Sequence, residues 1–104
     1  MKTQDRLAAP SLIEYEVGSV LRRYDFKGEI TAKRALRAFD DLRAMQLDIY
    51  DADQLQVRSW SHRNNMTFYD ASYVALAEML DVPLYTCDKR LASAPGHGAR
   101  IICF

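Results

Sequence analysis

MTFYDASYVALAEMLDVPLYTCDKRL, residues 66–91, decides the fold of this chain. Residues 68–80 are apolar on nearly every side, which is typical of a helix packed inside a domain. A short turn then leads into an apolar strand at 84–87. A parallel strand that follows a helix after a short turn runs back along it, so its carboxyl end lies near the first turn of the helix. We therefore expect Asp70 and Asp88 at one edge of a β-sheet.

Strands and helices alternate along the rest of the chain. Ser11, Thr31 and Thr67 precede apolar-periodic runs and are the expected helix N-caps, while Gly28 is expected to end the first helix. The patterning predicts strands at 6–10, 46–53 and 100–104, and helices at 12–26, 32–42 and 53–63. Such alternation argues for a single α/β domain over 1–104, with a mainly parallel β-sheet flanked by helices.

The composition is that of a folded domain without a charge bias. The chain has 104 residues, of which 49% are hydrophobic, and 14 Lys and Arg balance 14 Asp and Glu. Binding to nucleic acid would therefore need a local basic patch. No run is apolar enough to span a membrane, and the first residues lack the apolar core of a signal peptide, so we expect a cytoplasmic protein with no membrane partner. Cys87 and Cys103 are expected to be reduced, buried thiols.

Each of the two aspartates has a structural and a functional interpretation. Asp70 follows Thr67 by three residues, so the pair matches a capping box in the first turn of the helix. Asp88 stands at the carboxyl end of a strand, where parallel α/β sheets bind ligands, but it also suits a cap for the next turn. From the residues alone, both interpretations remain open.

Glu16 offers a third carboxylate. At about 100° per residue, it falls at the margin of the apolar stripe of helix 12–26 rather than in open solvent. Glu14 lies near the opposite margin and competes for the same role. Arg23, two turns after Glu16, lies on the same side, where a surface ion pair would be worth well under about 1 kcal/mol.

A cluster of carboxylates favours a bound cation, because like charges raise one another's pKa. Oxygen-only ligands select hard ions, so Mg²⁺ or Mn²⁺ is expected rather than Zn²⁺. Such an ion can generate hydroxide and neutralise a phosphate during in-line displacement. No serine–histidine–aspartate or cysteine–histidine set competes, and His62 and His97, beside loop signals, are expected to be solvated. Core packing and a partner groove both remain open as roles for Tyr15, Tyr24, Phe39 and Trp60.

Two segments together resemble a known family. They are APSLIEYEVGSVLRR at 9–23 and MTFYDASYVALAEMLDVPLYTCDKRLASAPG at 66–96. In combination they resemble the VapC-like PIN domains, the toxin ribonucleases of VapBC toxin–antitoxin pairs, and the resemblance runs from about residue 7 to the C-terminus. It implies a parallel-sheet sandwich and Mg²⁺- or Mn²⁺-dependent hydrolysis of RNA phosphodiesters. It also implies inhibition by a small VapB-like antitoxin whose tail lies over the active site.

The same resemblance assigns roles to residues. It implies that Glu16, Asp70 and Asp88 are the catalytic and metal-holding acids, with Glu16 preferred over Glu14. Thr86 would place a hydroxyl beside the metal cluster. In a ribonuclease of this type, Arg22 or Arg23 would bind the substrate by steering phosphate.

The chain departs from the family at its N-terminus. Family members usually begin with an apolar strand of the form Val-Asp-Ala-Ser, whose aspartate is a principal metal ligand and whose strand is central in the sheet, and this sequence starts after that point. Loss of a central strand would leave backbone groups unpaired. We therefore expect a domain that is truncated at its N-terminus, for which three explanations stay open: the gene product starts upstream, a second chain fills the gap, or the sheet closes up differently. If the chain is complete, we expect a strand-supplying partner or a swapped homodimer to fill the gap.

Two further hypotheses remain beside the ribonuclease. One is a truncated, inactive PIN domain that acts as a binding or dimerisation module, for which the absent first aspartate is the reason. The other is a plain α/β domain in which Asp70 and Asp88 are caps only.

Overall fold

Helix α4 (Phe68–Leu80) is the centre of the structure, a computed structural model that describes residues 2–3, 6–86 and 89–103. The helix begins where Thr67 accepts a hydrogen bond from the Asp70 N–H at 3.1 Å. It ends at Asp81, which takes a left-handed conformation with φ 52°. The N-cap and the range 68–80 are as predicted, and the helix buries Ala71, Val74, Ala75, Leu76 and Ala77.

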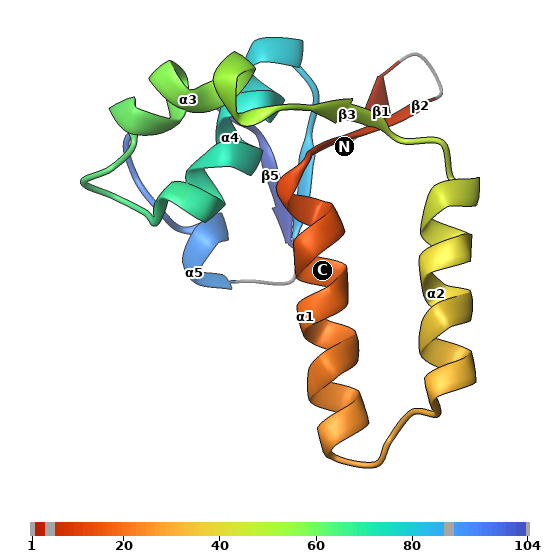
Figure 1. Cartoon of the computed structure of the whole chain (residues 1–104). Coiled ribbons are helices and arrows are strands. Elements are labelled where there is room, and N and C mark those ends of the chain that lie inside the picture. Colours follow the sequence, from red (N-terminus) through yellow and green to blue (C-terminus); the bar gives the residue numbers. More distant parts are fainter. Residues whose placement is uncertain (1, 4–5, 87–88, 104) are drawn as a thin grey trace.

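Strands and helices alternate along the chain in the predicted way (Figure 1). The elements before α4 are β1 (Lys2–Thr3), β2 (Arg6–Pro10), α1 (Leu12–Phe26), α2 (Ala32–Ala44), β3 (Asp48–Tyr50) and α3 (Ala52–Ser61). Those after it are β4 (Leu84–Thr86), α5 (Lys89–Ala92) and β5 (Ile101–Cys103). The α/β class is confirmed and β2 and α1 have the predicted bounds, while β3 is shorter than the strand predicted over 46–53.

The strands form two groups. β2 pairs with β3 in parallel and with β1 antiparallel, and β4 pairs with β5 in parallel. Within the described residues no strand ladder joins the two groups. The predicted parallel pairing is confirmed, whereas the break between the groups is a finding that sequence patterning did not indicate.

Helix α4 links the two groups by packing. Leu76 lies with Ala8 of β2 and Leu55 of α3 in one apolar cluster. Val74 lies with Leu84 of β4 in another, which also includes Ala77 and Leu91. The buried helix therefore takes the place of a continuous ladder in holding the strands together.

Helices α1 and α2 form a hairpin that stands away from the rest of the chain (Figure 1). Neither helix contains a buried residue. Gly18 lies opposite Phe39, where an added Cβ would sit 3.8 Å from the ring, and Gly28, with φ +69°, makes the turn after α1. The predicted apolar stripe of α1 is thus only partly covered, because a pair of helices has no further layer to bury its outer faces.

Local side chains set the starts of the other helices. Thr31 caps α2 by accepting a hydrogen bond from the Arg34 N–H at 3.1 Å, as predicted. Ser11 occupies the N-cap of α1, but its side chain makes no capping hydrogen bond. Before α3, the Asp51 N–H donates to Gln54 Oε1 at 2.9 Å.

Of the aromatic residues left open by the sequence, three are exposed: Tyr15, Tyr24 and Trp60. Phe39 is half-buried on α2, facing Gly18 of α1. Packing in the core is therefore not the role of the exposed three within this chain.

Candidate functional site

The candidate site is a pocket of about 270 Å³ at the carboxyl end of β4. Helix α1 contributes Glu16, helix α4 contributes Asp70 and Tyr73, and β4 contributes Thr86 at its last position. The pocket is completed by Leu84, Tyr85 and Leu91. The structure thus brings Glu16, Asp70 and Thr86 together from three separate elements, while Asp88 lies outside the described residues.

Tyr73 joins the two carboxylates. Its hydroxyl donates a hydrogen bond to Glu16 Oε1, and Asp70 lies one turn earlier on the same face of α4. Burial raises the pKa of the Tyr73 phenol far above its usual value, and the hydrogen bond to Glu16 and the charges of Glu16 and Asp70 raise it further. The phenol therefore stays protonated, and the negative charges of both carboxylates act on it.

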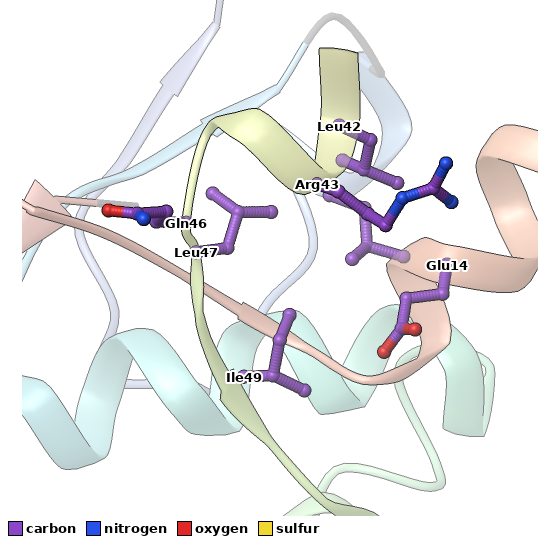
Figure 2. Close-up of a pocket in the computed structure, with 7 residues that line it drawn as sticks. Glu14, Leu42, Arg43, Gln46, Leu47 and Ile49 are labelled. Atoms are coloured by element: carbon purple, nitrogen blue, oxygen red, sulfur yellow. The ribbon is translucent and has the colours of Figure 1, made fainter. Parts of the chain in front are cut away.

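Glu14 points to a different place. It lines a pocket of about 200 Å³ between α1, the end of α2 and β3, together with Ile13, Leu42, Arg43, Gln46, Leu47 and Ile49. Figure 2 shows Glu14 in this pocket, together with side chains from the end of α2 and from the segment that leads into β3. Of the two glutamates that periodicity left open, Glu16 is the one that shares a pocket with Asp70.

The two arginines assigned to phosphate are neighbours on α1 but have different surroundings. Arg23 lines a groove of about 450 Å³ together with Glu16, Tyr15 and Tyr69. The Arg22 guanidinium instead lies over the Phe26 ring, 4.2 Å from its centroid. Arg23 is therefore the arginine that adjoins the candidate site.

The metal-ligand set is incomplete in the part of the chain that the structure describes. Over 2–3, 6–86 and 89–103, no three His, Cys, Asp or Glu side chains gather closely enough to hold a metal ion. The pocket is lined by two carboxylates and by the hydroxyl-bearing residues Tyr73, Tyr85 and Thr86. Such oxygen-only donors suit a hard cation rather than Zn²⁺.

A second polar cluster lies on the opposite end of α4. His62 is only 5% exposed, and its Nε2 atom lies 2.7 Å from Glu78 Oε1. The other Glu78 oxygen accepts a hydrogen bond from the Gly98 N–H at 2.6 Å. The expectation that His62 is solvated is wrong, because the loop before β5 folds back over the end of α3, and its His97 ring lies edge-on to His62 at 6.3 Å.

Several site features were not found from the sequence. Tyr73 follows Asp70 by three residues, and this spacing, which puts two side chains on one helix face, could have indicated it.

The expected state of the cysteines stays a prediction, since Cys87 lies outside the described residues and Cys103 is described only as the last residue of β5. Among the described helices, none combines the length and the apolar character needed to cross a membrane.

Comparison with known proteins gives the same family as the sequence motifs. The family model described as the PIN domain matches residues 1–96. The chain belongs to the PIN-domain family. Its relatives include Ribonuclease VapC1 of Mycobacterium tuberculosis, 48% identical over 89 residues, which are 85% of this chain and 67% of that protein. VapC ribonuclease Mb0985 of Mycobacterium bovis is 40% identical over 88 residues, 85% of this chain and 69% of that protein.

A third relative extends the match slightly. Ribonuclease VapC12 of Mycobacterium tuberculosis is 33% identical over 93 residues, which are 89% of this chain and 72% of that protein. The chain is thus a VapC-like PIN domain, as its motifs indicate.

Proposed function

We propose that this PIN domain is a metal-dependent endoribonuclease of the VapC toxin type, which hydrolyses RNA phosphodiesters in the cytoplasm and is neutralised by a VapB-like antitoxin. The observation that carries the proposal is the meeting of Glu16 and Asp70, from two helices, in one pocket with Thr86. The relatives, which are named ribonucleases, support the reaction class.

Mg²⁺ or Mn²⁺ is the ion we propose for this pocket. Glu16 and Asp70 would hold it, with Asp88, two residues beyond Thr86, as the third acid. Both acids line the pocket together with Tyr73, which supports a shared ion. When bound, such an ion supplies positive charge against the phosphate and lowers the pKa of bound water.

The chain's own residues prepare the pocket. The Tyr73 hydroxyl donates to one Glu16 oxygen and so fixes the direction of that carboxylate. We propose that the Thr86 hydroxyl lies beside the bound metal and helps to bind the RNA substrate. Arg23, in the adjoining groove, would attract the RNA backbone, and Arg22 would add longer-range steering.

RNA cleavage with Mn²⁺, with Mg²⁺ and with EDTA tests the proposal. Asp70→Asn and Glu16→Gln should each lower the rate by about 100-fold or more, since loss of a catalytic acid usually costs that much. Glu14→Gln is the matched control, because Glu14 lies on the same helix but in the other pocket, and it should cleave at the wild-type rate. Activity that ignores both the chelator and Asp70→Asn would exclude this function.

A second candidate function is a binding or dimerisation module, which the two separate strand groups favour. We infer that an outer edge of one of the two strand groups accepts a strand, from a second copy in a homodimer or from another partner, because unpaired strand edges recruit strands. Size-exclusion chromatography with light scattering should then give a species larger than 11.9 kDa. A stably folded monomer would count against this inference.

A further inference from the structure

Two exposed tyrosines stand directly beside the two acids of the candidate site. Tyr15 precedes Glu16 on α1 and is 77% exposed, and Tyr69 precedes Asp70 on α4 and is 66% exposed. Large aromatic rings gathered on a surface are typical of a binding site. Because they lie next to the acids, they are placed to contact a ligand that binds in the pocket of the acids.

Neighbouring pockets that share lining residues connect the tyrosines with the acids. Both line the groove that holds Glu16 and Arg23, and Glu16 also lines the pocket with Asp70. On their other side, both tyrosines border a more apolar pocket of about 200 Å³, whose wall includes Phe68. A ligand could thus extend from Arg23, past the acids, to the aromatic pocket.

The rings of Tyr15 and Tyr69 have no stacking partner within the described residues. Two other exposed aromatic rings are covered by cations: Arg22 lies over Phe26 and Arg63 over Trp60. The one ring-to-ring contact in the described part of the chain joins His62 and His97. The faces of Tyr15 and Tyr69 therefore remain available to a flat ligand.

We propose that Tyr15 and Tyr69 bind an unpaired base of single-stranded RNA, next to the phosphate that lies over Glu16 and Asp70. The inference rests on the proposed ribonuclease function and names how that site holds its substrate. Single-stranded RNA presents bases and phosphates in alternation, and proteins bind it with aromatic rings beside cations. Along α1 the order is Arg23, Glu16, Tyr15, so a cation for a phosphate lies on one side of the acids and the rings for a base lie on the other. The Ser11 hydroxyl, which makes no capping bond, lines the aromatic pocket, where it could meet a base edge.

Binding without metal tests the inference independently of cleavage. The probe is a fluorescent, unstructured RNA of mixed sequence in EDTA, and fluorescence anisotropy gives Kd. Tyr15→Ala and Tyr69→Ala should each raise Kd between about fivefold and about 100-fold, the range for loss of a stacked base. The Phe variants should bind like the wild type, because they keep the ring.

Tyr24→Ala is the matched control, since Tyr24 is an exposed tyrosine near the other end of α1, and its Kd should not change. An abasic RNA of the same length supplies the second arm. It should bind the wild type more weakly, and the Tyr→Ala variants should lose little further affinity for it.

Three results would overturn the inference. They are an unchanged Kd in both Tyr→Ala variants, an equal loss in the Phe and Ala variants, or an equal loss on mixed-sequence and abasic RNA. A change in self-association by light scattering with unchanged RNA affinity would assign the surface to protein contacts instead. Because the readout needs no metal, loss of cleavage in Asp70→Asn leaves this result unaffected.

Discussion

Tyr73 is the residue that relates the two described acids of the site to each other. It donates to Glu16 across from α4 to α1, and it shares a helix face with Asp70. Its raised pKa, caused by burial first and by the two carboxylates next, keeps it a donor at physiological pH. It acts through Glu16 and is therefore a positioning residue.

Tyr73→Phe removes the hydroxyl and keeps the ring. Glu16 would lose its orienting bond, and loss of such a partner costs a metal site about 10- to 100-fold in affinity or activity. We expect the Mn²⁺ concentration that half-saturates RNA cleavage to rise within that range. Tyr24→Phe, outside the pocket, should leave it unchanged, and an unaltered titration for Tyr73→Phe would reduce Tyr73 to a packing role.

Among the helices and loops, α3, α4 and the segment before β5 are tied together at Glu78, whose side chain is 10% exposed. A carboxylate can only accept, so His62 Nε2 carries the hydrogen of their 2.7 Å bond. Gly98 donates to the other oxygen, and Arg58 approaches at 3.9 Å. The contact between His62 and Glu78 is stronger than a surface ion pair because both of these side chains are shielded from water.

Glu78→Gln keeps the side-chain volume and removes the charge. We expect the free energy of unfolding in urea to fall by about 1–3 kcal/mol, the usual cost of leaving a buried hydrogen-bonding group unsatisfied. Asp81→Asn is the control, since Asp81 approaches Arg100 of the same segment but is fully solvent-exposed. Its urea midpoint should match the wild type, and equal midpoints for both variants would contradict the role of Glu78.

The contribution of Glu78 should also depend on pH. Burial would raise its pKa, but hydrogen bonds from His62 and Gly98 and the positive charges of His62 and Arg58 outweigh burial, so the pKa lies below the ordinary value of 4.5. A carboxyl with a lower pKa in the folded state stabilises fully above about pH 4.5 and loses that effect as the pH falls further. Urea midpoints measured through this acidic range should drop less steeply for Glu78→Gln than for the wild type, and parallel profiles would exclude the assignment.

For the molecule as a whole, α4 holds the fold together because it contributes to both apolar clusters. Leu76→Ala should lower the free energy of unfolding by about 2–5 kcal/mol, since Leu76 is fully buried. That is a large share of the roughly 5–15 kcal/mol of a small domain. Leu36→Ala, on the exposed face of α2, should stay within about 0.5 kcal/mol of wild type in the same denaturation experiment. A similar loss in both variants would mean that α4 does not dominate the core.

The candidate site was predictable in part. The place of Asp70 at the carboxyl end of β4 followed from the order helix, turn, parallel strand, whereas Thr86 came from the family motif. The residue Glu16 was preferred through the family motif, while periodicity alone left Glu14 equal to it. Tyr73, Tyr15 and Tyr69 gained their roles only through neighbours on other elements, which no local pattern encodes.

Local sequence was enough for the kinds of elements and for several of their ends, including α1, α4 and β2. Caps and apolar periodicity act within a few residues, so they can be recognised from the sequence alone. Contacts between distant segments settled the rest: α1 packs with Glu16 toward Asp70 and with Glu14 toward the end of α2, the loop before β5 buries His62, and α4 rather than a ladder joins the strand groups. These outcomes depend on which surfaces meet in space, and that information is spread over the whole chain.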